Sequence, residues 1–188
     1  MNLFSQSFSE LFKLGLEKGD KGDFYGSIAD FTKAIEIDNK NPFSYYNRGN
    51  MKYSLKDYKG SVLDYTKAIE IDNSKSYFFY SRGIAKKARN DFYEAIADFS
   101  KAIFLNPSDA ESYLYRGASK AALNIDYYGI IEDCSKAIEL NSKLSIAYSI
   151  RGLAKGNLGD KSGQCSDLKI AYELGDQNAF ELIPLFCK

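Results

Sequence analysis

Apolar residues recur along this chain at the three- and four-residue spacing of amphipathic helices. One such run contains Tyr45, Gly49 and Tyr53, and a second run extends from Val62 to Ile69. A polar turn separates the two runs. This arrangement predicts two helices joined by a short turn, and its recurrence along the chain predicts an all-α fold.

The pair of runs repeats with a fixed period. A glycine of the first run recurs in steps of 34, 34, 34 and 35 residues, at Gly15, Gly49, Gly83, Gly117 and Gly152. A period of this length is typical of a solenoid, so we expect one elongated domain over 1–188. Its predicted repeats are 8–41, 42–75, 76–109, 110–144 and 145–178. The extra residue of the fourth repeat lies between Gly117 and Asp126, in the turn, where an insertion costs little.

Each second run follows an aspartate, which caps a helix by accepting bonds from free backbone N–H groups. These residues are Asp23, Asp57, Asp91, Asp126 and Asp160. Glu94 follows Asp91 by three residues, and Glu10 follows Ser7 by three, so both places predict a capping box. A small residue recurs later in the second run, which indicates closely crossing helices; it is Ala34, Ala68, Ala102, Ala137 and Ala171.

The last segment, 176–188, departs from the repeat. Asp176 is positioned to cap a short helix, and Pro184 is expected to end it. An end repeat of a solenoid leaves an apolar face open, which a terminal helix can cover. We expect that cover to consist of Ala179, Phe180, Leu182 and Ile183.

The repeat resembles the tetratricopeptide repeat, whose pattern is W-x2-L-G-x2-Y, then A-x3-F and a late proline. In the third repeat the aligned residues are Phe79, Arg82, Gly83, Lys86, Ala95, Phe99, Ala102 and Pro107. Arginine and lysine replace the leucine and tyrosine of the pattern, and only Pro107 matches the closing proline. The resemblance extends over about residues 8–178. It implies a right-handed α-α superhelix with a concave groove that binds proteins or peptides.

A row of charged residues recurs in step with the glycines. Arginine precedes the glycine in four repeats, and an aspartate of the second run matches it: Arg48 and Asp64, Arg82 and Asp98, Arg116 and Asp133, Arg151 and Asp167. The arginines either bind an acidic or phosphorylated ligand or pair with the aspartates within the protein. Because the two residue types recur together, we favour structural ion pairs.

The resemblance also implies which first-helix residues line the groove. Carried over position by position, the set is Phe43, Tyr46, Asn47, Asn50, Tyr53, Tyr77, Tyr80, Ser81, Ile84, Lys87 and Tyr115. Tyrosine offers a rigid apolar ring with a polar tip, which suits peptide recognition. The alternative is that these rings are exposed without a binding role. For Tyr45, Phe79, Tyr113 and Tyr148, one position before the groove, we expect burial between repeats.

A chaperone-binding subclass of the family holds a C-terminal carboxylate with a lysine, asparagine and arginine clamp. The corresponding positions here are Phe12, Leu16, Asn47, Tyr77 and Ser81. Only Asn47 matches, and a frame shifted by one repeat is no better. We therefore do not expect binding to the acidic chaperone tail.

The composition excludes most catalytic chemistry. The chain of 188 residues has no histidine, which removes His-dependent triads and the commonest metal ligand. The glycine-rich turns lack a phosphate-loop ending. Three cysteines, Cys134, Cys165 and Cys187, occur without a CxxC pair, and we interpret them as buried thiols. No enzyme activity, metal or cofactor is predicted.

Charge and hydropathy limit the partners. Lysine plus arginine equals aspartate plus glutamate, 25 each, so no net field attracts nucleic acid or an anionic membrane. The N-terminal residues lack the basic and apolar parts of a signal peptide, and no apolar run reaches a membrane-spanning length. We expect a cytoplasmic protein without a membrane or nucleic-acid partner.

The predicted function is a non-enzymatic adaptor or scaffold that binds a protein or peptide, as a monomer or weak homo-oligomer. Two alternatives stay open. One is a structural repeat protein that self-assembles into a homo-oligomer. The other is RNA binding, since related helical arrays read one base per repeat, although zero net charge opposes it.

Overall fold

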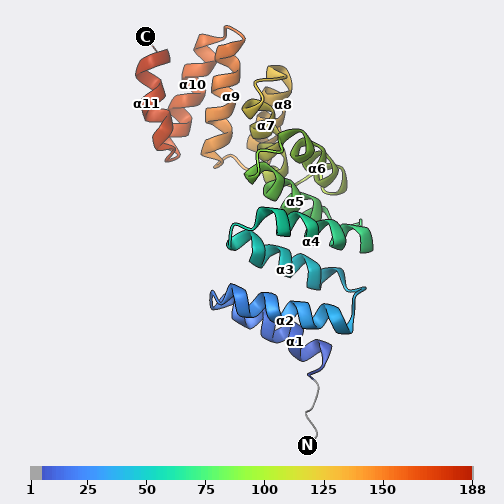
Figure 1. Cartoon of the computed structure of the whole chain (residues 1–188). Helices are drawn as coiled ribbons and strands as arrows, with labels where there is room; N and C mark the ends of the chain where they lie inside the picture. The colour runs from blue at the N-terminus through green and yellow to red at the C-terminus, as the bar shows by residue number, and fades with distance from the viewer. Residues whose placement is uncertain (1–5, 188) are drawn as a thin grey trace, which may run out of the picture. The chain divides into compact units, whose positions relative to one another are not determined.

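The computed structural model describes residues 6–187, which form eleven helices and no strand. The all-α prediction is therefore confirmed over these residues. Contacts within the chain divide it into two units, residues 1–90 and 91–188. In both units each helix packs against the next one along the chain, as in a helical repeat array (Figure 1). The first five residues and Lys188, the last residue of the expected terminal segment, lie outside the described range.

The N-terminal unit contains five helices. They are α1 (Phe8–Asp20), α2 (Phe24–Ile37), α3 (Pro42–Ser54), α4 (Tyr58–Ile71) and α5 (Ser76–Ala88). The C-terminal unit contains the other six described helices. They are α6 (Phe92–Leu105), α7 (Ala110–Ala122), α8 (Tyr127–Leu140), α9 (Ser145–Asn157), α10 (Lys161–Glu173) and α11 (Gln177–Phe186). The bounds of α1 to α10 fall within the five expected repeats, two helices to each.

Tight turns join the two helices of each repeat because one turn residue adopts a left-handed conformation. This residue is Gly22, Lys56, Asn90 or Gly159 in the three-residue turns. The turn between α7 and α8 has one residue more, and both Asn124 and Asp126 have positive φ there. The insertion therefore lies where the sequence places it.

Four of the five expected aspartate caps are present. Asp23, Asp57, Asp126 and Asp160 each accept a hydrogen bond from the backbone N–H of the glycine three residues later. Asp91 precedes α6 but its side chain makes no capping bond, so the capping box predicted with Glu94 is wrong. In the four capped turns an aspartate oxygen lies 2.0–2.1 Å from where a Cβ on the glycine would be, which is too close for a residue with a Cβ such as Glu94. The box between Ser7 and Glu10 is confirmed.

Small residues permit the close crossing of paired helices. A Cβ added to Gly15 would lie 2.9 Å from the Phe31 ring, and one added to Gly49 would lie 2.8 Å from the Tyr65 ring. The five recurring alanines of the second helices are fully buried. Burial of a ring under Gly15 and Gly49 removes a large apolar surface from water, so the glycine at this position permits the close crossing of the two helices.

The C-terminal segment differs from its prediction in two respects. Helix α11 continues through Pro184 to Phe186, because a proline so near the end removes only one helical hydrogen bond. Ala179 is buried, and Leu182 and Ile183 pack with it on Leu168. Phe180 is 56% exposed instead of covering the apolar face, and its ring lies 5.2 Å from that of Tyr172.

The cysteine interpretation also needs correction. Cys134 is a buried free thiol, as expected. Cys165 on α10 and Cys187 at the end of α11, however, form a disulfide, with their Cα atoms 5.4 Å apart. The cysteines are 22 residues apart in sequence, and only the antiparallel packing of α11 on α10 brings them together. The sequence spacing alone carried no signal for this pairing.

Candidate functional site

Three buried aspartates of the charged row are each bound by two cations of the preceding helix: Asp64, Asp133 and Asp167. In the second repeat, Arg48 donates from Nε and Nη2 to the two oxygens of Asp64, at 3.0 and 2.7 Å. The Nζ atom of Lys52, one turn further along α3, lies 2.8 Å from the same carboxylate. Asp64 is buried, so a bidentate arginine and a lysine neutralise its charge away from water.

The same arrangement occurs in the fourth and fifth repeats. Asp133 is bound by Arg116 and Lys120, and Asp167 by Arg151 and Lys155. Burial by itself raises the pKa of Asp167, but the hydrogen bonds from Arg151 and Lys155 outweigh it, so that the pKa lies below its ordinary value. In the first repeat Lys18 alone approaches Asp30, at 2.6 Å. Pairing between Arg82 and Asp98 stays a prediction.

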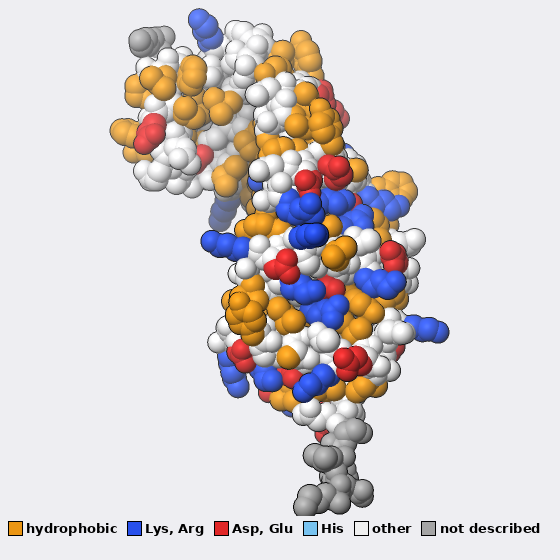
Figure 2. Space-filling model, in the orientation of Figure 1, with side chains coloured by type: hydrophobic (Ala, Val, Ile, Leu, Met, Phe, Trp, Pro, Cys, Tyr) orange, Lys and Arg blue, Asp and Glu red, His pale blue; other side chains and the backbone are white. Residues whose placement is uncertain are grey.

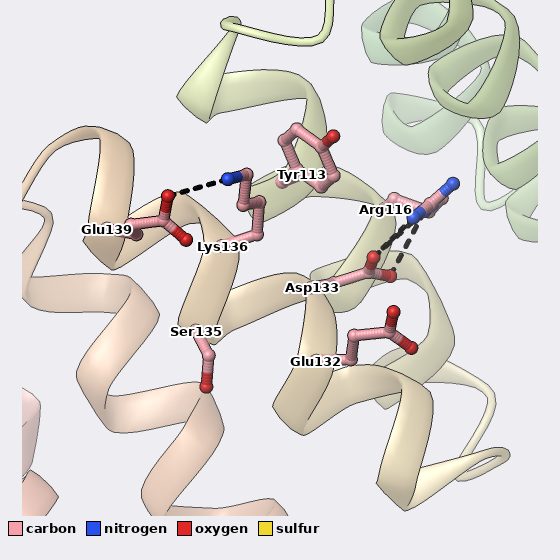
Figure 3. A pocket seen from close by; sticks show the side chains of 7 residues that line it. All are labelled: Tyr113, Arg116, Glu132, Asp133, Ser135, Lys136 and Glu139. Carbon is pink, nitrogen blue, oxygen red and sulfur yellow. Dashed lines mark hydrogen bonds and ion pairs between the residues drawn. The ribbon is translucent and has the colours of Figure 1, made fainter.

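A surface pocket of about 410 Å³ shows which groups pair with the cations that line it (Figure 3). Tyr113 and Arg116 of α7 line it together with residues of α8. Arg116 is bonded to Asp133, and the Lys136 ammonium lies 2.7 Å from Glu139. The cations in this pocket are therefore engaged within the protein, which disfavours a role in holding an acidic ligand.

Each arginine makes two further contacts that the sequence reasoning missed. Its guanidinium lies over the ring three residues earlier, as with Arg48 over Tyr45 at 5.6 Å. It also donates to a hydroxyl on the second helix of the preceding repeat. These hydroxyls belong to Thr32, Thr66, Ser100 and Ser135, bonded by Arg48, Arg82, Arg116 and Arg151 at 3.1–3.2 Å.

The signals for these contacts are present in the sequence. A Tyr or Phe stands three residues before every one of the four arginines, and a Thr or Ser stands sixteen residues before it. Leu14 occupies the arginine position of the first repeat and Lys169 the hydroxyl position of the fifth. The arginines thus link the repeats to one another as well as the two helices within a repeat.

An aromatic cluster forms on the first helices of the N-terminal unit. Tyr46 of α3 lies at its centre, with its ring centroid 5.2 Å from Tyr77 and 5.1 Å from Phe78 of α5. Phe43 approaches Phe78 at 6.1 Å. Phe78 is fully buried, whereas Phe43 and Tyr77 are 39% and 38% exposed. A buried ring therefore supports a partly exposed aromatic surface, which we call the aromatic cluster (Phe43, Tyr46, Tyr77 and Phe78).

Polar members of the predicted groove set surround this cluster. The amide of Asn47 donates to the Phe43 carbonyl at 2.9 Å, and the Ser81 hydroxyl lies 3.5 Å from that of Tyr46. The amide oxygen of Asn50 accepts a 2.8 Å bond from the Tyr65 hydroxyl. Asn50 is therefore partly engaged in supporting the ring beneath Gly49.

The remaining predicted groove residues lie apart from the cluster centre. Tyr53 packs on Tyr58 at 5.2 Å, at the far end of α3. Tyr80, Ile84 and Lys87 are half-buried on α5. Tyr115 belongs to the C-terminal unit, where its ring stacks on that of buried Phe99 at 6.0 Å. The residues that the structure brings together are thus those of α3 and the first turns of α5.

The C-terminal unit has a small apolar pocket of about 200 Å³ that the sequence reasoning did not identify. Its walls come from α7, α8 and α9, and it is lined by Ala121, Asn124, Tyr127, Ile130, Ile150, Leu153, Ala154 and Asn157. No charged side chain is among these. Applying the groove positions to the fifth repeat as well would have found Ile150, Leu153 and Asn157.

Three further features concern metal binding, the free cysteine and the membrane. Within residues 6–187 no three His, Cys, Asp or Glu side chains gather closely enough to hold a metal ion. Burial raises the pKa of the Cys134 thiol to about 12, so it is a poor nucleophile. None of the helices in this range has the length and apolar character that a bilayer span requires. On the face drawn in Figure 2, acidic and basic side chains of the N-terminal unit are interspersed.

Comparison with known proteins identifies the type of the first two repeats. The family model for the tetratricopeptide repeat matches residues 11–41 and 44–75. No curated protein matches the chain in sequence. Among solved structures, MamA protein is similar with a TM-score of 0.83 and 22% identity, over 96% of each chain. YrrB, a TPR protein with an unusual peptide-binding site, gives a TM-score of 0.82 at 18% identity, over 93% of this chain and 91% of its own.

A third structure is similar over a shorter range. The first TPR of Spaghetti (RPAP3), bound to the HSP90 peptide SRMEEVD, has a TM-score of 0.62 and 24% identity. The match covers 66% of this chain and 99% of that one. At such identities the likeness concerns the fold, and the two matched sequence segments coincide with the first two helix pairs.

Proposed function

Because the chain carries tetratricopeptide repeats, we propose that it is a non-enzymatic adaptor that binds a protein or peptide segment on its first helices. The aromatic cluster of α3 and α5 carries this proposal. Rings that are held rigidly yet remain partly exposed lose little conformational entropy on binding, which is why such residues dominate recognition surfaces. The adjacent Asn47 and Ser81 supply polar groups for the backbone of a bound segment.

The charges and the neighbouring structures refine the expected partner. Arg48, Arg116 and Arg151 are engaged by buried aspartates, so the proposal assigns no role to an acidic ligand on the charged row. YrrB and Spaghetti are TPR proteins with a peptide site or a bound peptide, which supports peptide binding as a class. The absence of the clamp residues speaks against the acidic chaperone tail as the ligand here.

The adaptor reading is tested by selecting peptides from a displayed library against the whole chain and measuring their affinity by calorimetry. Tyr46→Ala and Tyr77→Ala together should weaken a selected peptide at least about tenfold, as expected for a central hot spot. The matched control is Tyr25→Ala with Tyr128→Ala, which removes two rings that are each 76% exposed on second helices. Equal losses in both variants would contradict binding at the aromatic cluster.

Self-assembly remains the second candidate, favoured by the zero net charge, which gives little repulsion between copies. Light scattering over a range of concentrations separates self-assembly from the adaptor function, because only self-assembly predicts a mass that rises with concentration. Loss of that rise in the Tyr46 and Tyr77 double variant would make the aromatic cluster a self-association surface. A cytoplasmic location and the lack of a nucleic-acid partner stay predictions.

A further inference from the structure

The disulfide between Cys165 and Cys187 forms part of the wall of a pocket of about 530 Å³ at the end of the C-terminal unit. Two lysines, two serines and Phe186 complete the described lining. Both cysteines are only half-buried. A volume of this size lies within the range of small-molecule sites, so a peptide-sized thiol can reach the sulfur atoms.

The charged side chains among the described residues of the lining are all positive. Lys161 and Lys169 stand four residues before and four residues after Cys165, so all three lie on one face of α10. No acidic side chain is among the described residues of the lining. The pocket therefore attracts anions, in contrast to the pocket of Figure 3, where the lysine and arginine are paired with carboxylates.

The two sulfur atoms differ as leaving groups. The ammonium groups of Lys161 and Lys169 stabilise a thiolate at Cys165. Cys187 follows the last turn of α11, where the unpaired carbonyl groups oppose a negative charge. The sulfur whose thiolate is more stable leaves faster in thiol–disulfide exchange, so an incoming thiolate is directed to the Cys187 sulfur.

From this geometry we propose that the pocket is a thiol-exchange site for a small anionic thiol of the glutathione class. The incoming thiolate attacks Cys187 Sγ, forms a mixed disulfide there and releases Cys165 as a thiolate beside the two lysines. A second thiolate then attacks the mixed disulfide, so that the small disulfide departs and Cys187 becomes a thiolate. Two electrons pass from two small thiols to the protein disulfide.

Opening the disulfide also changes what holds α11. The start of α11 is fixed by the Asp176 cap and by a hydrogen bond from the Ser149 hydroxyl to Asp176. The middle of the helix is fixed by the packing of Ala179, Leu182 and Ile183. The last turn is tied to α10 by the disulfide. Exchange at this site therefore loosens the last turn of α11 while the start of the helix stays in place.

The proposal is tested on the oxidised full chain with three thiol reactions followed by acid quenching and mass spectrometry. Reduced glutathione is compared with the neutral 2-mercaptoethanol and with cationic cysteamine. In the wild type, glutathione should open the disulfide fastest relative to the intrinsic reactivity of each thiol, and the first adduct should map to Cys187. Hydrogen exchange should then rise at 183–187 and not at 177–179.

The decisive variant is Lys161→Gln with Lys169→Gln. The rate constant with glutathione, divided by that with 2-mercaptoethanol, should fall roughly tenfold. Lys33→Gln with Lys143→Gln is the matched control, since it makes the same change in net charge with exposed lysines outside the pocket, and it should leave the ratio unchanged. An unchanged ratio in the pocket variant, a first adduct on Cys165, or free thiols at both positions in the air-oxidised chain would overturn the proposal.

Discussion

The second and fourth repeats share one framework but pack it with different side chains. Both have a buried aspartate held by an arginine and a lysine, an arginine bond to the preceding repeat, and a glycine at the helix crossing. These residues are Arg48, Lys52, Asp64 and Gly49 in one repeat, and Arg116, Lys120, Asp133 and Gly117 in the other. The distances within the two charge clusters agree to within a few tenths of an ångström.

The side chain beneath the glycine is where the repeats differ. In the second repeat it is Tyr65, whose ring is buried and whose hydroxyl bonds Asn50. Burial raises the pKa of this hydroxyl above its ordinary value, so it stays protonated and donates. In the fourth repeat the same place holds the Cys134 thiol, 3.2 Å from where a Cβ on Gly117 would lie. The fourth crossing is therefore less filled.

The residues that recur between the repeats and the residues that differ have separate roles. The charged residues and small residues recur because they fix how helices meet. The rings beneath the glycines and at the groove positions vary from repeat to repeat, and on α3 and α5 rings at the groove positions belong to the aromatic cluster. Features that recur thus describe the fold, and features that one repeat has and another lacks describe where recognition is proposed.

The largest effect is expected where the repeats agree. Asp64→Ala and Asp133→Ala should lower the free energy of unfolding by up to about 3–5 kcal/mol, because each removes the buried carboxylate that pairs with an arginine and a lysine. Urea unfolding of the two variants measures this loss of stability. The loss should be larger for Asp64→Ala, because Lys120 keeps its 3.0 Å ion pair with Asp126 when Asp133 is removed.

The control for this comparison is Asp20→Ala, which removes an exposed aspartate at the end of α1 and should change the stability by less than about 0.5 kcal/mol. A loss below about 1 kcal/mol in either buried variant would show that the cluster is not desolvated in solution. A loss at Asp133 that equals or exceeds the loss at Asp64 would show that the pair between Lys120 and Asp126 does not compensate.

Alanine in place of the glycine at the helix crossing should have different effects on stability in the two repeats. Alanine gains about 1 kcal/mol over glycine as a helix former. At Gly49 its Cβ meets the Tyr65 ring at 2.8 Å, and overpacking of about 1–3 kcal/mol should exceed this gain. At Gly117 the contact with Cys134 is 3.2 Å, so Gly117→Ala should be neutral within about 1 kcal/mol.

Replacing the ring of the second repeat with the thiol of the fourth tests whether the ring causes this difference. In a Tyr65→Cys background the ring is absent, so Gly49→Ala should become neutral or stabilising, as at Gly117. The coupling between the two changes should then be about 1–3 kcal/mol by a double-mutant cycle in urea. Additive effects would mean that the ring does not determine the glycine.

A smaller effect belongs to the second repeat alone. Tyr65→Phe removes the hydroxyl that bonds Asn50 at 2.8 Å and should lower stability by about 0.5–1.5 kcal/mol. In an Asn50→Ala background the same change should have less effect, because the partner is already gone. Thermal unfolding of the four proteins gives the comparison, and an equal loss in both backgrounds would contradict a role of this bond.

Most of the fold follows from the sequence because periodic features are local and repeat five times. The glycine period, the aspartate before each second helix and the extra turn residue before Asp126 all predicted what the structure contains. The failures are single occurrences. Asp91 lost its cap through a Cβ at Glu94, and Phe180 is exposed because α11 turns only Ala179, Leu182 and Ile183 inward.

The candidate site was less predictable because it depends on contacts between distant residues. Position in the repeat placed Phe43, Tyr46 and Tyr77 together, but not the buried Phe78 that supports them. The disulfide between Cys165 and Cys187 depends on how α11 returns along α10, which no local pattern specifies. Likewise, the hydroxyl partners of the arginines were visible only as a second periodic residue, whose role required the packing of one repeat on the next.

The smallest expected effect compares the turns of the two repeats. Lys56 has φ 62°, a left-handed conformation that costs an L-residue about 1–2 kcal/mol and glycine almost nothing. Because glycine also gives the unfolded chain more freedom, Lys56→Gly should gain only about 0.5–1 kcal/mol. Asn124 has φ 53°, which asparagine tolerates, so Asn124→Gly should change the stability by less than about 0.5 kcal/mol. Thermal unfolding measures both, and an equal gain at the two positions would show that the lysine is not strained more than the asparagine.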